Sequence, residues 1–257
     1  MWYLSGLTGS HCFVFLDDIV VYVKSLADHD ADIRQVFDRL RESNLKLKPE
    51  KCEFLRKEVI YLGHVISENR VLPDKTKTKV TEEFPTPQTV KQLKSFLGLM
   101  SYYRRFNPGF SGLASPLHKL LKKDARYERT NEQEHAFRCL KNKLISRPIL
   151  RYPDYSREFI LTTDASNEGV RAVISQGEIG KDLPKAFASR SLHKAEKNYS
   201  TTEKEILAIV WGVRYFRPYL YGKKIHCSNG SQTPHVDQEC ERSRTKFTKM
   251  ENKAERV

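Results

Sequence analysis

The stretch Cys12-Phe13-Val14-Phe15-Leu16-Asp17-Asp18-Ile19-Val20-Val21-Tyr22 places two adjacent carboxylates between two apolar segments. β-Branched and aromatic residues on both sides of a short acidic break predict a β-hairpin with its turn at Leu16-Asp17-Asp18. Two like charges in apolar surroundings are costly unless a cation or hydrogen bonds compensate them. Divalent metals prefer oxygen ligands, so Asp17 and Asp18 are candidate metal ligands. The alternative is a solvated turn, where Asp is favoured by local hydrogen bonds.

The composition favours a polyanionic partner. The chain has 257 residues and a net charge of +13, which is long enough for two domains, or for one and a half plus a tail. A cationic surface of this size attracts nucleic acid, although a membrane surface would favour the same sign of charge. Five scattered cysteines without a CxxC pair predict no disulfide framework and a reducing location, in the cytoplasm or nucleus. We expect no signal peptide and no transmembrane segment.

Periodicity predicts the elements that follow the acidic hairpin. Ile33, Val36, Phe37 and Leu40 repeat at helical spacing and predict an amphipathic helix. Leu45 and Leu47 alternate with lysines and predict a short strand that ends at Pro49. The segment 59–66 predicts a second hairpin, or a bent strand, in which Gly63 allows the tight bend.

Helices are expected in the middle of the chain. The segment 73–87 carries three prolines and reads as a polar connector. Thr89 is the expected N-cap of the next helix, with Gln92 in capping-box position. Its apolar face comprises Val90, Leu93, Phe96, Leu97, Met100 and Tyr103. Two further helices are predicted over 114–123 and 132–145.

A separate unit is predicted from about residue 155. Buried strands are expected over 159–164, 170–176 and 185–190. Ser200 and Glu203 form a second capping box that opens a helix. From about Ser228 the sequence is polar and lacks clear periodicity, which predicts a disordered tail.

Several motifs in one order resemble a known family. The hairpin is similar to the Tyr/Phe-x-Asp-Asp motif of reverse transcriptases, best matched in the Pol polyproteins of Ty3/gypsy-type long-terminal-repeat retrotransposons. The resemblance covers about residues 4 to 225. It continues through the following motifs: Leu45 to Phe54, Val59 to Ser67, Phe96 to Leu99, Tyr102 to Phe106, Leu161 to Ser166, Asn198 to Glu205, and Tyr215 to Gly222.

The resemblance implies an α+β architecture: a partial polymerase palm with β-hairpins, a helical thumb, and a truncated ribonuclease H-like α/β domain. Relative to the family, the chain is expected to be truncated at both ends. The implied parts are a partial palm (1–75), a thumb-like helical region (76–125), a linker or connection (126–154), the truncated ribonuclease H-like domain (155–227), and a divergent, disordered tail (228–257).

The resemblance also implies catalytic and metal-binding residues. Polymerases of this kind hold two Mg²⁺ or Mn²⁺ ions with three carboxylates, and two of them match Asp17 and Asp18. The third lies upstream in the family. Asp164 matches the first acid of the ribonuclease H site and Glu205 the second, while Glu203 competes for that role but has a structural task as a cap.

The ribonuclease site departs from the family pattern in three respects. Gly230 stands where the family's third acid is expected, and the fourth acid is absent from this sequence. Arg171 replaces a residue that is usually small and could disturb packing. These departures indicate an incomplete ribonuclease site.

Nucleic-acid contacts are implied at two places. Tyr61, Leu62, Gly63 and His64 resemble the hairpin that grips the primer end; the alternative is an ordinary core hairpin. A second set is basic and follows the thumb helix, where it could meet phosphates, or could form a solvated helix face. These residues are Lys91, Lys94, Arg104 and Arg105.

The function implied by resemblance is an RNA-directed DNA polymerase with ribonuclease H, acting on primer-template or RNA/DNA hybrid, with dNTPs as substrates of the intact enzyme. Two alternatives stay open. The chain is a catalytically inactive or domesticated remnant that binds nucleic acid, or it is one piece of a longer reading frame. No pattern indicates an oligomeric state.

Overall fold

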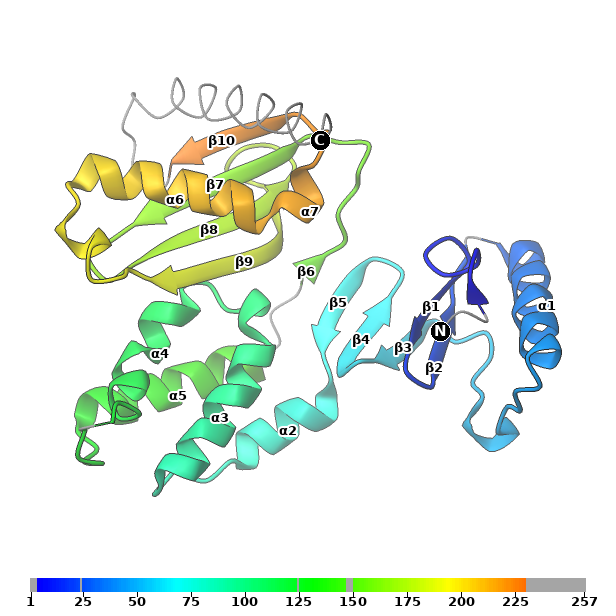
Figure 1. The fold of residues 1–257 in the computed structure, drawn as a ribbon, viewed down its shortest axis with the longest axis horizontal. Helices are drawn as coiled ribbons and strands as arrows, with labels where there is room; N and C mark the ends of the chain where they lie inside the picture. Colours follow the sequence, from blue (N-terminus) through cyan, green and yellow to red (C-terminus); the bar gives the residue numbers. More distant parts are fainter. Residues whose placement is uncertain (1–3, 24, 124, 147–149, 230–257) are drawn as a thin grey trace. The chain divides into compact units, whose positions relative to one another are not determined.

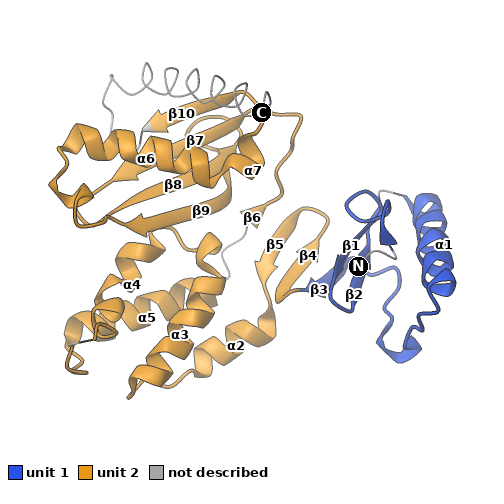
Figure 2. Cartoon of the chain, in the orientation of Figure 1, with its two compact units in different colours: residues 1–61 blue, residues 62–257 orange. Residues whose placement is uncertain are grey.

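The chain forms two compact units, residues 1–61 and 62–257 (Figure 2). The computed structural model describes residues 4–23, 25–123, 125–146 and 150–229. The tail predicted over 228–257 therefore lies outside the described residues beyond Asn229. Within the described residues, no helix is both long and apolar enough to cross a membrane.

The first unit is a β-hairpin packed on a helix (Figure 1). Its elements are β1 (Cys12–Phe15), β2 (Asp18–Val21), α1 (Leu26–Glu42), the 3₁₀ helix η2 (Pro49–Lys51) and β3 (Glu58–Tyr61). One face of the hairpin contributes Cys12 and Val21 to a core with Val36 and Leu40 of α1. The predicted hairpin and the predicted amphipathic helix are both confirmed.

The strand predicted at Leu45 and Leu47 is wrong. Residues 45–48 form no regular element, and both leucines are 44% exposed. Alternation of apolar and charged residues favours a strand only where a neighbouring strand can pair with it. Here the chain turns into η2 at Pro49 instead.

The second unit begins with a small antiparallel sheet and a layer of helices. Its first elements are β4 (His64–Ser67), β5 (Arg70–Pro73), α2 (Lys75–Glu83), α3 (Val90–Tyr102), η3 (Arg104–Phe106), α4 (Phe110–Lys119), α5 (Asn131–Ile145) and β6 (Leu150–Arg151). β4 pairs with β5, and β5 pairs with β6. The segment read as a connector thus contains α2, a helix that the apolar pattern did not predict because it buries Thr78 and Thr81 rather than large apolar side chains.

Local signals explain where these helices begin. The Thr89 side chain caps α3 by accepting from the backbone N–H of Gln92 at 3.2 Å. The Gln92 side chain accepts from the backbone of Gln88 instead of completing a capping box. α4 begins at Phe110, four residues before the predicted start, because Gly109 adopts φ 68° and turns the chain into the helix.

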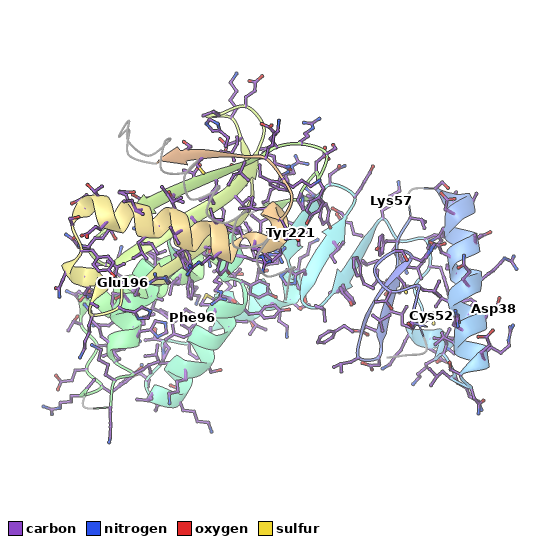
Figure 3. The ribbon with its side chains drawn as sticks, turned by 45° about the horizontal axis from the view of Figure 1, so that its top comes forward. Asp38, Cys52, Lys57, Phe96, Glu196 and Tyr221 are labelled. Atoms are coloured by element: carbon purple, nitrogen blue, oxygen red, sulfur yellow. The ribbon has the colours of Figure 1, made fainter. Side chains whose placement is uncertain are left out.

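The helical layer encloses the largest core of the protein. The predicted apolar face of α3 packs against α5 through Phe96 and Phe137, whose ring centroids lie 4.6 Å apart. Phe96 is fully buried within this layer (Figure 3). Val90 is the exception on that face, since it is 39% exposed at the helix start.

The rest of the second unit is a four-stranded sheet covered by a helix. Its elements are β7 (Phe159–Ala165), β8 (Gly169–Gln176), β9 (Leu183–Ser191), the 3₁₀ helix η4 (Glu196–Asn198), α6 (Thr201–Tyr215), α7 (Arg217–Leu220) and β10 (Ile225–Asn229). The strand order is β10-β7-β8-β9, with β10 parallel to β7 and the other pairs antiparallel. The three predicted strands are confirmed, whereas β10 was not predicted.

The two faces of this sheet have different neighbours. A Cβ at Gly212 of α6 would lie within 3.5 Å of the side chains of Leu161, Thr163 and Ala172, so α6 covers that face (Figure 1). The opposite face meets the start of α4, where the Ser111 backbone N–H donates to the Ser189 hydroxyl at 2.9 Å. Thr163 faces α6, and side chains alternate along a strand. Asp164, the next residue, therefore lies on the second face, the one that meets α4.

Candidate metal and nucleic-acid sites

The two carboxylates of the acidic hairpin lie at its tip. Phe15 pairs with Asp18, so Leu16 and Asp17 alone form the loop and Asp18 begins β2. Both carboxylates are exposed to solvent. This exposure removes the desolvation cost that burial would impose on two adjacent negative charges.

The same loop holds a strained backbone. Leu16 adopts φ 55° and is 67% exposed. The left-handed conformation costs a non-glycine residue about 1–2 kcal/mol. Such strain is concentrated at functional sites, so its presence beside Asp17 supports a functional role for the turn.

Tyr61 lies near the acidic hairpin within the first unit. Burial raises the pKa of the Tyr61 hydroxyl, and the negative charge of Asp18 raises it further. The predicted nucleic-acid contact at Tyr61 and the predicted metal ligand at Asp18 are therefore neighbours.

The acidic hairpin supplies only part of a metal site. Asp17 and Asp18 offer the hard oxygen ligands that Mg²⁺ and Mn²⁺ prefer. Within the described parts of the chain, no cluster of three or more His, Cys, Asp or Glu side chains could hold a metal. The two carboxylates fit two of the three expected ligands, and the described residues do not complete the set.

The second hairpin turns at Leu62 and Gly63, which follow β3 and precede β4. Their φ values are 48° and 67°. Two consecutive residues with positive φ are typical of the tight type I′ turn. As in the acidic hairpin, a leucine occupies a left-handed position.

Three side chains hold this turn from within the second unit. The Tyr103 hydroxyl donates to the Gly63 carbonyl at 2.7 Å, and the Tyr102 hydroxyl donates to the Leu62 carbonyl. The Nδ1–H of His64 also donates to the Leu62 carbonyl, at 2.7 Å. Both tyrosines belong to a motif identified in the sequence, but their hydrogen bonds to this turn were not predicted. A hydroxyl that bonds to a residue 40 positions away leaves no local sequence pattern.

His64 is packed in an aromatic pocket. Its ring centroid lies 5.5 Å from that of Tyr103 and 5.6 Å from that of Phe106. Burial lowers the pKa of the imidazole, the hydrogen bond to Leu62 opposes this change, and the Arg105 charge adds to it. His64 is therefore a neutral, structural member of the turn near neutral pH.

The four basic residues predicted to meet phosphates differ in exposure. Lys91, Lys94 and Arg104 are exposed, as phosphate contacts require. Arg105 is half-buried, and its guanidinium lies 5.4 Å from the centroid of the Phe106 ring. Its Nε is buried and has no hydrogen-bond partner among the described residues.

Asp164 lies beside an arginine on the α4 face of the sheet. Asp164 and Arg171 are direct cross-strand partners, and Arg171 Nη1 lies 3.8 Å from Asp164 Oδ2. The guanidinium also lies over α4, where a Cβ at Gly109 would be 3.4 Å from Arg171 Nε. Arg171 therefore packs against Gly109 and Gly112 at the start of α4, and its guanidinium lies next to Asp164, the candidate metal ligand.

Glu205 and Glu203 have distinct environments on α6. Glu203 closes the predicted capping box, accepting from the backbone N–H of Ser200 at 2.7 Å. The hydrogen bonds from Ser200 lower the pKa of Glu203. Glu205 is buried, being 8% exposed, on the helix that covers the face opposite Asp164.

The position expected for the third ribonuclease acid, residue 230, directly follows the last described residue, Asn229. β10 pairs in parallel with β7 and brings Asn229 beside Thr163, one residue before Asp164. Gly230, which stands where an acid was expected, lies outside the described residues. Within the described chain, Asp164 and Glu205 gain no third acidic partner, and this set does not fit a complete two-metal site.

Two family models match the chain. Residues 2–66 match "Reverse transcriptase (RNA-dependent DNA polymerase)", and residues 130–227 match "RNase H-like domain found in reverse transcriptase". The first match includes the acidic hairpin and the predicted nucleic-acid turn at residues 61–64. The second includes Asp164 and Glu205.

Curated relatives are polyproteins of transposons. The Retrovirus-related Pol polyprotein from transposon 297 of Drosophila melanogaster is 42% identical over 89% of this chain and 21% of its own length. The Transposon Tf2-3 polyprotein of Schizosaccharomyces pombe is 37% identical over 82% of this chain and 16% of its own length. The chain thus spans about a fifth of the length of such relatives.

Solved structures share the fold. A foamy viral protease-reverse transcriptase in complex with double-stranded DNA matches with a TM-score of 0.79 and 21% identity, over 96% of this chain and 45% of that one. The same type of protein in complex with RNA/DNA hybrid matches with a TM-score of 0.76 over 95% of this chain and 35% of that one. The α+β fold class is confirmed. The chain therefore carries one stretch that matches the reverse transcriptase family and one that matches the RNase H-like domain of reverse transcriptases, and it is similar to the Pol polyproteins of retrotransposons.

Proposed function

We propose that this chain is part of an RNA-directed DNA polymerase with a ribonuclease H-like region, which acts on primer-template and RNA/DNA hybrid. The observation that supports it is the acidic hairpin tip, where Asp17 and Asp18 are exposed beside a strained turn. Asp17 and Asp18 would hold Mg²⁺ or Mn²⁺, which would supply positive charge for the phosphate oxygens in nucleotidyl transfer. In the intact enzyme, dNTPs are the second substrate.

The remaining residues of the chain would bind and orient nucleic acid. Tyr61, Leu62, Gly63 and His64 present a rigid turn to the primer end, with His64 positioning the turn rather than carrying charge. Exposed basic side chains at the thumb neutralise phosphates without reading sequence. These are Lys91, Lys94 and Arg104, with Arg105 positioned beneath them against Phe106.

Primer extension tests the proposal. The purified chain is incubated with primer-template, dNTPs and Mg²⁺ or Mn²⁺, beside the Asp17→Asn variant. Asn keeps the size of the side chain but removes the charge that a metal needs. Extension that disappears in Asp17→Asn supports polymerase function, and extension that persists in the variant contradicts the role of Asp17.

A second function is favoured by a different observation. The Arg171 guanidinium lies 3.8 Å from Asp164, so the ribonuclease H-like unit supplies its own cation where a metal is expected. We propose as the alternative that the chain binds nucleic acid without catalysis. Salt-dependent binding of an RNA/DNA hybrid, with neither extension nor cleavage, supports this alternative; a hybrid affinity that does not change with salt contradicts both functions.

We also propose an intracellular location, in the cytoplasm or nucleus. The proposal rests on the sequence, whose scattered cysteines include no CxxC pair.

A further inference from the structure

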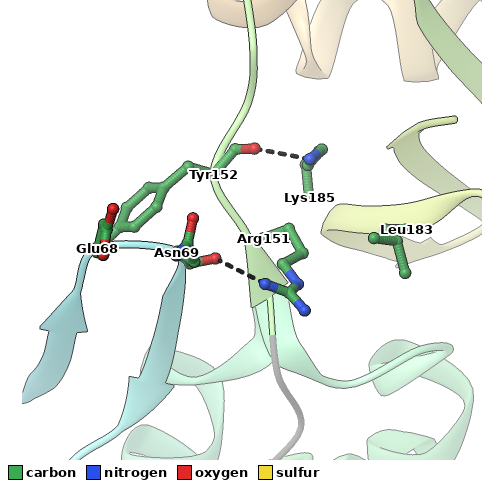
Figure 4. A pocket seen from close by; sticks show the side chains of 6 residues that line it. All are labelled: Glu68, Asn69, Arg151, Tyr152, Leu183 and Lys185. Carbon is green, nitrogen blue, oxygen red and sulfur yellow. Dashed lines mark hydrogen bonds between the residues drawn. The ribbon is translucent and has the colours of Figure 1, made fainter.

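A small cleft in the second unit is lined by two cations that the proposed function does not use. It measures about 220 Å³. Three chain segments contribute to it: the β4–β5 loop, β6 with the residue after it, and β9 (Figure 4). The lining residues are Glu68, Asn69, Arg151, Tyr152, Leu183 and Lys185.

Backbone carbonyls, and not carboxylates, hold both cations in place. Lys185 Nζ donates to the Tyr152 carbonyl at 2.6 Å, and Arg151 Nη1 donates to the Asn69 carbonyl at 3.5 Å. Neither side chain is within 4 Å of a carboxylate in the described chain. Lys185 keeps two further N–H donors and Arg151 keeps four, so donors remain for a ligand.

Lys185 lies close to other cations. Burial lowers the pKa of the Lys185 ammonium, and the charges of Arg151 and Arg157 lower it further, against an opposing effect of Asp154.

We propose that this cleft binds one backbone phosphate of a nucleic acid through Arg151 and Lys185. The inference rests on the nucleic-acid binding proposed above and adds a contact that lies apart from the thumb helix. A phosphate accepts hydrogen bonds on several oxygens at once, which suits the planar donor fork of Arg151 beside the single ammonium of Lys185. The Tyr152 hydroxyl is buried.

Salt-dependent hybrid binding provides the test, with Arg151→Gln as the main variant. Each neutralised phosphate contributes about 0.9 to the slope of log affinity against log salt for duplex nucleic acid. Loss of one contact therefore flattens the slope by about 0.9 and weakens binding about 8-fold at 0.1 M salt. Matching thermal melting curves for the wild type and the variant establish that the fold is kept.

Two controls sharpen the result. Arg126→Gln makes the same charge change at an exposed arginine that pairs with Glu128 at 2.9 Å, and it is expected to leave the slope unchanged. Glu68→Gln removes the opposing carboxylate of the cleft and is expected to strengthen binding. Equal effects of Arg151→Gln and Arg126→Gln would overturn the assignment, as would weaker binding by Glu68→Gln.

The pKa of Lys185 provides a readout independent of affinity. A bound phosphate offsets the repulsion from Arg151, so the pKa of Lys185, followed by NMR of its Cε, is expected to rise when hybrid is added. A rise with inorganic phosphate but not with hybrid would overturn the backbone assignment. Salt-dependent hybrid binding with an unchanged Lys185 pKa would overturn the cleft while leaving the proposed function intact.

Discussion

The contact between Gly63 and Tyr103 yields a prediction that can be worked out quantitatively. Gly63 has φ 67°, and a Cβ added there would lie 3.0 Å from the Tyr103 hydroxyl oxygen. In Gly63→Ala the left-handed backbone costs about 1.5 kcal/mol. Crowding against the hydroxyl adds about 1 kcal/mol, the low end for overpacking. We expect Gly63→Ala to lose about 2.5 kcal/mol of unfolding free energy.

Tyr103→Phe removes the hydroxyl and leaves the ring. The Gly63 carbonyl keeps a second donor, the Asp74 backbone N–H at 3.0 Å, so it does not become unsatisfied. The loss is therefore that of one net hydrogen bond, about 1 kcal/mol. Burial raises the pKa of Tyr103 to about 12, so this hydroxyl remains a donor and the loss is the same from neutral pH to about pH 10.

The double variant distinguishes crowding from backbone strain. With the hydroxyl gone, the alanine Cβ no longer meets it, and the crowding of about 1 kcal/mol disappears. Gly63→Ala/Tyr103→Phe is therefore expected to lose about 2.5 kcal/mol rather than the additive 3.5 kcal/mol. Urea unfolding measures these losses, and hydrogen exchange at the Asp74 amide reports on the turn itself.

Tyr102→Phe is the matched control. The nearest Tyr102 atom to the added Cβ is Cε1 at 3.6 Å, an ordinary van der Waals separation. Gly63→Ala and Tyr102→Phe are therefore expected to be additive within about 0.5 kcal/mol. Additivity in the Tyr103 cycle as well would refute the close contact between the hydroxyl and Gly63.

Three further predictions concern the sheet and its helices. Gly169→Ala places a Cβ 2.5 Å from the Arg190 carbonyl oxygen and is expected to cost about 3 kcal/mol or more of unfolding free energy. Gly98→Ala in α3 meets nothing within 4 Å and is expected to stabilise the fold by up to about 1 kcal/mol. Thermal melting measures both changes, and similar shifts of the melting temperature in the two variants would contradict both expectations. Hydrogen bonds from Arg190 lower the pKa of Glu196 from 4.5 to about 2, so the stability that Glu196 contributes is fully present above about pH 4.5 and is lost as the pH falls toward 2. Glu196→Gln should be less stable at pH 7 and show a flatter decline over that range, and an unchanged profile would exclude the ion pair. Ser200→Ala removes the N-cap of α6 and is expected to lower the free energy of unfolding in urea by about 1 kcal/mol. An unchanged free energy of unfolding would contradict the capping box.

Local patterns predicted the elements whose signals lie within a few residues. The acidic hairpin follows from apolar segments around a turn, and α6 follows from the Ser200–Glu203 capping box. β10 was missed because five residues with only one buried apolar side chain resemble a loop until β7 provides a parallel partner. Leu45 and Leu47 failed for the converse reason, since a strand pattern needs a strand to pair with.

The candidate site divides in the same way. Residue types alone identify Asp17, Asp18, Asp164 and Glu205 as acids in motif positions, because the chemistry of each is carried by its own side chain. Their surroundings depend on partners distant in sequence. The turn at Gly63 is held by Tyr103, 40 residues away, and the phosphate cleft joins the β4–β5 loop to β9.

For this protein, the sequence by itself determined the family, the acidic turn and most of the helices, since these depend on residue identity and short-range spacing. Only the tertiary structure decided which charges meet. Strand register sets Arg171 opposite Asp164, and chain folding gathers Arg151 and Lys185 into one cleft. Electrostatic interactions depend on distance in space, and the order of residues along the chain does not specify that distance.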